Sequence, residues 1–210
     1  MLILHTYWRS TTSYRVRIAL AMKGIEYQSR PVDLVAGAQR APDYVALNPI
    51  QGVPTLVLED GAVLTQSMAI LDYLDHLEPE PPLLPKNDPL LRARIMAAAM
   101  VIATDVHPVN NLKVVTQIKD IAGPEEGLPW MQHWMVHGFA AFAALIEPAT
   151  PFAFGDQPTL ADICLVAQLY NAHRWKFDLS ATPRLLDIEQ RCLDLPAFDA
   201  ARPENQMDAT

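Results

Sequence analysis

Apolar and polar positions in the first third of the chain follow a pattern that predicts short strands separated by helices. Strand spacing occurs in four segments, residues 2–7, 27–32, 55–59 and 62–64. Helical spacing occurs in residues 12–23, 39–47 and 66–77. Asp60-Gly61, between the last two strands, is a hairpin signal. This order predicts a small α/β domain with a mixed four-stranded sheet, begun by a parallel, right-handed β-α-β unit.

Beyond residue 77 the pattern changes, because proline becomes frequent and strand spacing stops. Residues 78–88 hold a dense proline cluster that cannot continue a helix, and we interpret them as a linker. Helical spacing then covers residues 90–121, 130–146, 159–174, 183–193 and a short stretch after Pro196. The polar tail from Pro203 is expected to fray. The chain is therefore predicted to form an α/β domain at residues 1–80 and an all-helical domain at residues 88–210.

Composition and charge narrow the classes of partner. The 210 residues are 50% hydrophobic and carry a formal net charge of −8, which argues against nucleic acid or an acidic membrane as a bulk partner. No apolar run is long enough to span a bilayer, and the first residues lack a signal-peptide pattern. The only two cysteines, Cys164 and Cys192, predict no disulfide framework. We therefore expect a cytoplasmic protein.

The segment Arg9–Leu20 holds the most informative candidate chemistry. Several hydroxyls, among them Ser10 and Thr12, stand where a helix is predicted to begin, soon after the first strand. A helix N-terminus has free backbone N–H groups and a partial positive charge, so a hydroxyl there can help to hold a thiolate. The alternative is that these hydroxyls are ordinary helix caps, and this segment taken alone favours the cap.

Two more segments describe a binding site of the same kind. Val53-Pro54 precedes a predicted strand and is a candidate cis peptide that would turn the Val53 backbone towards an extended peptide. A trans proline at the start of a strand is the alternative, and taken alone it is the better supported. Gln66-Ser67 opens a predicted helix, where a serine can bind a carboxylate or simply cap the helix. Together, the three segments suit a tripeptide thiol.

Residues 9–20, 48–56 and 66–74 resemble the cytosolic glutathione transferases. The first stretch reads RSTTSYRVRIAL and is similar to the zeta class, which includes maleylacetoacetate and maleylpyruvate isomerases. That class typically has a cysteine in the position of Thr12, and its maleylpyruvate isomerase branch has threonine. The resemblance implies the glutathione transferase fold, with a thioredoxin-like first domain that binds glutathione and a helical second domain that contributes the substrate pocket.

The same resemblance assigns the cofactor glutathione to particular positions. They are Ser10, Thr12, Gln51, Val53, Gln66, Ser67, His107 and Asn111. It implies that Ser10 stabilises the glutathione thiolate and that the Val53 backbone contacts the cysteinyl part. It further implies that Gln66 and Ser67 hold the γ-glutamyl end.

The resemblance also assigns the catalytic positions. These are Ser10, Thr12 and Arg174, and Arg9, at the top of the first predicted strand, is a second candidate for the substrate carboxylate. The planar fork of arginine matches a carboxylate, so Arg9 and Arg174 are expected to orient an acidic substrate. His107 and Asn111 lie in the predicted long helix, where Pro108 would bend the chain and direct both side chains, one turn apart, towards a common cleft. From the residues alone, a kinked helix with a satisfied histidine is the alternative.

The implied function is that of a glutathione-dependent cis–trans isomerase of maleylpyruvate or maleylacetoacetate in aromatic catabolism. The residues do not separate this activity from that of a transferase or dehalogenase acting on small α-haloacids, and a non-catalytic binding module of the same fold is a third alternative. A homodimer follows from the resemblance. We expect no metal, because His133 and His137 lie four residues apart without an evident third ligand.

Overall fold

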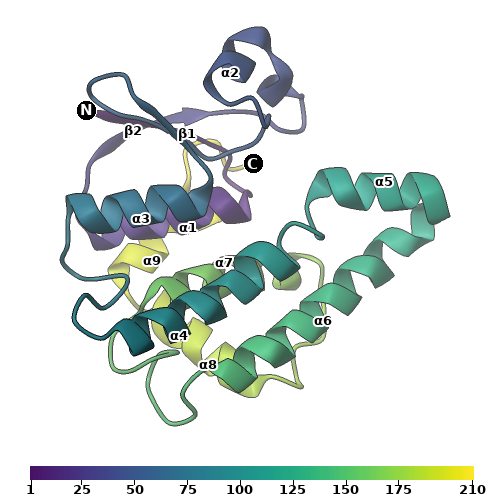
Figure 1. Ribbon diagram of the computed structural model, residues 1–210. Helices are drawn as coiled ribbons and strands as arrows, with labels where there is room; N and C mark the ends of the chain where they lie inside the picture. The colour runs from purple at the N-terminus through teal and green to yellow at the C-terminus, as the bar shows by residue number, and fades with distance from the viewer. The chain divides into compact units, whose positions relative to one another are not determined.

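The computed structural model describes residues 1–210 as two compact units (Figure 1). The first unit comprises Met1–Pro81 together with Leu193–Thr210, and the second comprises Pro82–Cys192. The sequence-based division placed residues 193–210 with the helical domain, whereas in the structure they pack with the α/β unit.

A four-stranded mixed sheet is the framework of the first unit. Its elements are β1 (Leu2–Thr6), α1 (Thr11–Met22), β2 (Tyr27–Pro31), a 3₁₀ turn (Ala38–Arg40), α2 (Pro42–Leu47), β3 (Thr55–Val57), β4 (Val63–Thr65) and α3 (Ser67–Leu77). The strand order is β2-β1-β3-β4, in which β1 runs parallel to β2 and antiparallel to β3. Strand β4 pairs antiparallel with β3 through the hairpin at Asp60-Gly61. The predicted α/β fold and mixed sheet are confirmed.

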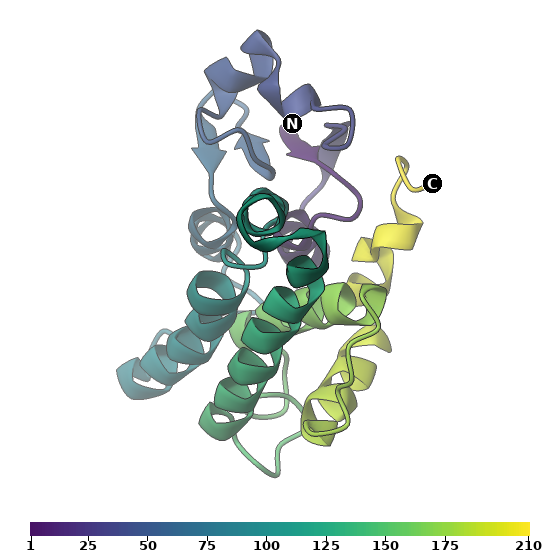
Figure 2. The same ribbon diagram turned by 90° about the vertical axis from the view of Figure 1, so that its right-hand side faces the viewer.

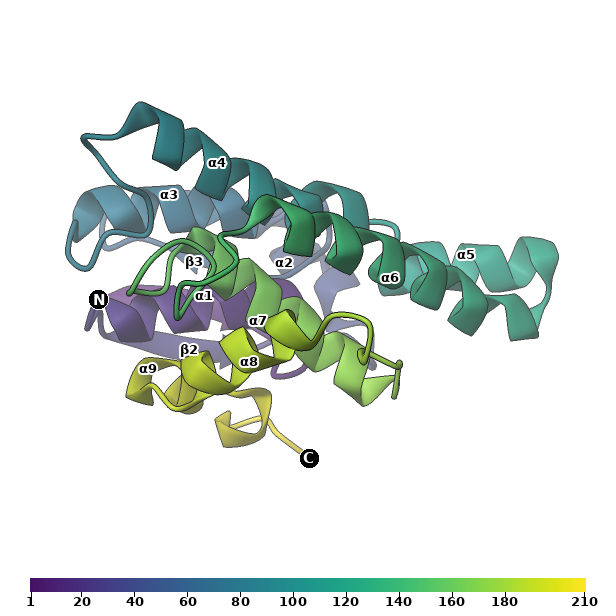
Figure 3. The ribbon, with the colours of Figure 1, turned by 90° about the horizontal axis from the view of Figure 1, so that it is seen from below.

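Helix α1 is buried on nearly all sides, and even its two arginines, Arg15 and Arg17, are 1% exposed. Val16, Ile18 and Leu20 are all 0% exposed. The helix contacts α3 and also α9 (Pro196–Ala201), so it has neighbours on more than one face (Figures 1 and 3). Because such close packing leaves little freedom of movement, the residues at the start of α1 stand on a rigid support.

The tail from Pro203 is ordered, so the expectation that it frays is wrong. Pro203–Asn205 form a 3₁₀ turn. Asn205 Nδ2 donates to the carbonyl oxygen of Asp199 at 2.7 Å, and Gln206 Nε2 donates to that of Arg202 at 2.8 Å. The polar side chains that suggested fraying therefore satisfy backbone carbonyls of the preceding turn.

The second unit is all-helical, as the sequence predicted. Its elements are α4 (Pro89–Met100), a π-helical turn (Val101–Val106), α5 (Leu112–Ala122), a 3₁₀ turn (Pro124–Glu126), α6 (Gly127–Leu145), α7 (Leu160–Arg174) and α8 (Pro183–Leu193). Helix α6 runs beside α5 (Figures 1 and 2). Every residue of α7 from Leu160 to Leu169 is buried, so this helix is the core of the unit. None of the helices has both the length and the apolar character needed to cross a bilayer.

The predicted single helix over residues 90–121 is wrong, because the structure breaks it into α4, a π-helical turn and α5. Residues 107–110 are turns, and they contain Pro108, which has no N–H to continue the helical ladder. Asn111 then starts α5 as its N-cap, with Oδ1 accepting from Lys113 N at 3.2 Å. His107 and Asn111 therefore do not lie one turn apart on a common helix.

Candidate functional site

The turn between β1 and α1 presents Ser10 as the N-cap of the helix. Its backbone is extended, and its Oγ accepts a hydrogen bond from Ser13 N at 3.2 Å. Its own N–H donates to the carbonyl oxygen of Tyr7 at 2.9 Å, which closes the turn. The first turn of α1 contains no acidic side chain. The positive end of the helix dipole is therefore not neutralised by a carboxylate from its own first turn.

Ser10 and Thr12 form a hydrogen-bonded pair of hydroxyls that reaches a second segment of the unit. Their oxygen atoms lie 3.0 Å apart, and Thr12 Oγ1 donates to the carbonyl oxygen of Val53 at 2.8 Å. A hydroxyl has a single proton. Since the Thr12 proton goes to Val53, Ser10 must donate to Thr12. The result is a directed chain of hydrogen bonds from the helix start to the segment before β3.

The segment that carries Val53 is held firmly from α2. The Val53–Pro54 peptide is cis, and Gln51 adopts a positive φ of 57°. The carbonyl oxygen of Gly52 accepts from both Tyr44 Oη at 2.6 Å and Asn48 Nδ2 at 2.8 Å. Burial raises the pKa of the Tyr44 phenol, which keeps this hydroxyl a donor. Sequence patterns gave no sign of the Tyr44 contact, because it joins residues of different elements.

The start of α3 lies at the same end of the β3–β4 hairpin as Val53. Thr55 pairs with Thr65, so Val53, which precedes Pro54, lies at the same end of the hairpin as the residue that follows β4. That following residue, Gln66, has a φ of 69°, and α3 has no side-chain N-cap. A helix start without a cap leaves backbone N–H groups available to an anion.

Ser67, the first residue of α3, is supported by a buried arginine that the sequence patterns did not single out. Arg15 Nη1 donates to Ser67 Oγ at 3.4 Å, and Arg15 is 1% exposed. A guanidinium stays protonated in proteins, so it adds positive charge behind the start of α3. The donor set at this end of the hairpin fits a carboxylate, and the hydroxyls at the start of α1 fit a thiolate. Together they fit one end and the centre of glutathione.

Arg9 and Arg174, the predicted substrate-binding arginines, both stack on tryptophans. The Arg9 guanidinium lies 4.7 Å from the centre of the Trp8 ring, and its Nη2 donates to Tyr7 Oη at 2.8 Å. The Arg174 guanidinium lies 5.1 Å from the centre of the Trp175 ring. Arg9 belongs to the first unit and Arg174 to the second. Their roles stay predictions.

His107 and Asn111 lie in the second unit, at the ends of different elements. The His107 backbone N–H donates to the carbonyl oxygen of Ile102 at 2.9 Å and closes the π-helical turn. Asn111 uses its side chain as the N-cap of α5. The glutathione contacts assigned to these two residues stay predictions.

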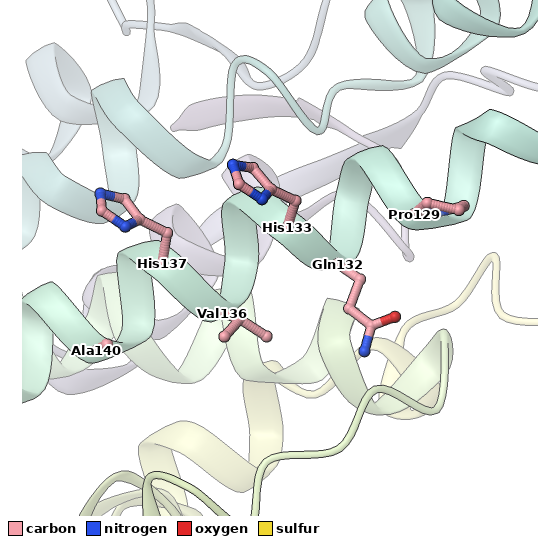
Figure 4. Close-up of a pocket in the computed structure, with 6 residues that line it drawn as sticks. All are labelled: Pro129, Gln132, His133, Val136, His137 and Ala140. Carbon is pink, nitrogen blue, oxygen red and sulfur yellow. The ribbon is translucent and has the colours of Figure 1, made fainter.

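A shallow hollow of about 580 Å³ lies along one face of α6 (Figure 4). It is lined by Pro129, Gln132, His133, Val136, His137 and Ala140. The rings of His133 and His137 extend from the same side of the helix (Figure 4). No group of three or more histidine, cysteine, aspartate or glutamate side chains is placed to hold a metal ion. Both cysteines are free and buried, and burial raises the pKa of the Cys192 thiol.

Comparisons with known proteins place the chain in a family. Residues 1–76 match the glutathione S-transferase N-terminal domain. The chain is 48% identical over 206 residues to a maleylacetoacetate isomerase of Rhizobium meliloti (strain 1021), covering 96% of each chain. The holo structure of a bacterial maleyl pyruvate isomerase of the zeta class has a TM-score of 0.95 and 37% identity, over 99% of this chain and 100% of that one. A maleylacetoacetate isomerase from Anaeromyxobacter dehalogenans 2CP-1 with bound GSH has a TM-score of 0.91 and 40% identity, over 100% and 98%.

With a thioredoxin-like sheet, a helical second unit and hydroxyls at the start of α1, the chain belongs to the glutathione transferase family. Within that family it belongs to the zeta class, together with the maleylacetoacetate isomerases. The resemblance inferred from residues 9–20, 48–56 and 66–74 is confirmed. The structure brings Ser10, Thr12 and Val53 together, as a common site requires.

Proposed function

We propose that this protein is a glutathione-dependent cis–trans isomerase of a small conjugated dicarboxylate, maleylacetoacetate or maleylpyruvate. The observation that carries the proposal is the hydrogen-bonded chain from Ser10 through Thr12 to Val53, in a chain 48% identical to a maleylacetoacetate isomerase. Bound glutathione supplies a thiolate, which can add reversibly to a conjugated double bond and so allow rotation about it.

Ser10 is the residue that holds the sulfur in its anionic form. Its oxygen accepts from Ser13 N, which polarises the hydroxyl and strengthens it as a donor. Its proton points to Thr12 in this structure and needs only a rotation about the C–O bond to face another acceptor. A free thiol has a pKa of about 8.5, so a donor and a helix dipole that favour the thiolate increase the nucleophile present near neutral pH.

Thr12 and Val53 have a different role, because the Thr12 proton is already committed to the Val53 carbonyl oxygen. Thr12 fixes the backbone that pairs with the cysteinyl part of glutathione. Gln51 shapes the same segment through its positive φ. Gln66 and Ser67 bind the γ-glutamyl end through the start of α3. His107 and Asn111 contribute further glutathione contacts from the helical domain.

Arg9 and Arg174 bind the carboxylates of the substrate. Each guanidinium stacks on a tryptophan, which limits its rotation, and its planar fork of N–H donors matches a carboxylate. Carboxylate binding orients the double bond and stabilises negative charge that develops next to it. The α/β unit forms the glutathione-binding domain, the helical unit contributes to the substrate pocket, and the protein works as a cytoplasmic homodimer.

The test is an isomerase assay with maleylpyruvate and maleylacetoacetate, each with and without glutathione. The proposal expects turnover that depends on glutathione and returns it free. Accumulation of a stable glutathione thioether would instead identify a transferase. No turnover of either dicarboxylate, by protein that still binds glutathione, would contradict the proposed activity.

A further inference from the structure

The loop that carries Arg9 receives a contact from the far end of the chain. Trp8 N donates to Asp208 Oδ2 at 3.0 Å, across 200 positions in the sequence. The other oxygen, Asp208 Oδ1, is buried and has no hydrogen-bond partner. The bond to Trp8 is therefore the one hydrogen bond that this side chain makes. Burying a carboxylate oxygen without a hydrogen bond costs free energy. Packing of the tail by itself therefore does not account for the buried position of Asp208.

A second set of hydrogen bonds joins the same loop to the end of α9, just before the tail. Arg17 is 1% exposed, and its Nε donates to the carbonyl oxygen of Ala201 at 3.1 Å. Its Nη2 donates to the carbonyl oxygen of Trp8 at 3.0 Å. The Trp8 peptide is thus held from both sides, by Asp208 at its N–H and by Arg17 at its carbonyl. Asp208 makes its hydrogen bond to this loop and to no other element, whereas Arg17 also donates to the end of α9.

The position of Arg9 depends on that of Trp8. The Arg9 guanidinium lies 4.7 Å from the centre of the Trp8 ring and 5.7 Å from that of Tyr7. No carboxylate of the chain forms an ion pair with Arg9, and its Nε and Nη2 donate to Tyr7 Oη at 3.3 and 2.8 Å. The aromatic pair is therefore what sets the direction of this side chain, and movement of the Trp8 backbone would redirect it.

We propose that Asp208 is a positioning residue for substrate binding, which holds Trp8 so that Arg9 faces the dicarboxylate. The inference rests on the proposed function, because it takes Arg9 as a carboxylate ligand. The hydrogen bond of Asp208 goes to Trp8, and those that join Ser10, Thr12 and Val53 do not involve it, so we expect Asp208 to act on the dicarboxylate and to leave glutathione binding unchanged. It thereby gives the tail a role that a merely structural segment would not have.

The experiment compares Asp208→Ala with Asp208→Asn, which keeps an acceptor oxygen for Trp8 N. Asp199→Ala is the matched control, because Asp199 lies in α9, just before the tail, and its carboxylate forms an ion pair with Arg202, at 3.1 Å, and not with the loop. The readouts are the KM for maleylpyruvate, the Kd for glutathione, and the Kd for malonate in glutathione-saturated protein by calorimetry. Malonate is a suitable probe because a relative from Methylobacterium extorquens AM1 was crystallised with bound malonate and GSH. Circular dichroism confirms that each variant is folded.

Asp208→Ala is expected to raise the KM for maleylpyruvate and the Kd for malonate about fivefold, as the loss of one hydrogen bond implies. The Kd for glutathione should stay within about twofold, and Asp208→Asn and Asp199→Ala should both resemble the wild type. Equal weakening of malonate and glutathione, or no change in either, would overturn the inference. A wild-type protein that binds no malonate would also overturn it. A protein that binds malonate but lacks isomerase activity would instead contradict the proposed function alone.

Discussion

Helices α1 and α7 both have a hydroxyl residue as N-cap, Ser10 and Thr159, but only α7 has a carboxylate in its own first turn. Asp162 accepts from Ala153 N, Thr159 N and Thr159 Oγ1 at 2.8, 2.8 and 2.9 Å. Burial raises the pKa of this carboxyl, and its hydrogen bonds act in the opposite direction. At α1 the first turn has no acidic residue. A helix start whose N–H groups bond a carboxylate of the same helix stabilises the fold. One that is lined by hydroxyls and has no such carboxylate can receive an external anion.

The largest expected effect on stability concerns Asp162, the carboxylate at the start of α7. Asp162→Ala removes the acceptor of three buried donors, so the free energy of unfolding should fall by about 4 kcal/mol. Urea denaturation measures the loss. The folded fraction should still bind glutathione with unchanged affinity by calorimetry. A variant that keeps its stability but loses glutathione binding would contradict the view that the start of α7 serves the fold and the start of α1 serves the ligand.

At the start of α1 we expect a large loss of activity and a small loss of stability. Ser10→Ala removes the proposed donor to the sulfur and should lower kcat of the isomerase about 100-fold, the cost typical of losing one preorganised donor to an anion. The free energy of unfolding should fall by only about 1 kcal/mol, because the residue also caps the helix. Unchanged turnover would remove Ser10 from the mechanism.

A smaller effect separates Thr12 from Ser10. Thr12→Val keeps the shape of the side chain but loses the bond to the Val53 carbonyl oxygen, so the Kd for glutathione should rise about tenfold. Thr12→Ser, which keeps the hydroxyl, should restore the affinity and serves as the control. If Thr12→Val instead lowered kcat with an unchanged Kd, Thr12 would be the donor to the sulfur.

The smallest effect lies at the other end of α7. His173 Nε2 lies 2.7 Å from Glu189 Oε2, and this hydrogen bond raises the pKa of His173. Because the folded-state pKa lies above the unfolded value, the stabilisation is fully present below the unfolded pKa. It is lost as pH rises through the folded pKa. The imidazole is half-exposed, so the change should stay below about 1 kcal/mol.

Urea unfolding of the wild type and of His173→Gln, at pH 5.5 and at pH 9, measures this effect. The wild type should exceed the variant in stability more at the lower pH than at the higher one. A difference that grows as pH rises would contradict the role given to the pair. The stability lost in Ser10→Ala should show no such dependence, since the hydrogen bonds of Ser10 and Thr12 involve Ser13 N, the Val53 carbonyl oxygen and each other, none of which titrates in this range.

Local patterns predicted most of the elements, because helix periodicity, capping and tight turns involve residues within a few positions of one another. The strands, the hairpin at Asp60-Gly61 and the helix over residues 159–174 all follow from such patterns. The helix over residues 90–121 was mispredicted because its apolar spacing continues past Pro108, while the missing N–H ends the ladder there. The tail was mispredicted because a polar sequence gives no sign that its side chains will bond the preceding carbonyls.

By itself, then, the sequence determined the family, the order of elements, and the hydroxyls that stand at the start of α1. Only the tertiary structure decided that Thr12 bonds Val53, that Arg15 stands behind Ser67, and that Asp208 holds Trp8. The physical reason is distance along the chain. A helix or a turn is stabilised by neighbours in sequence, whereas these contacts join segments 41 to 200 positions apart. Such segments meet only after the apolar core has fixed where each element lies.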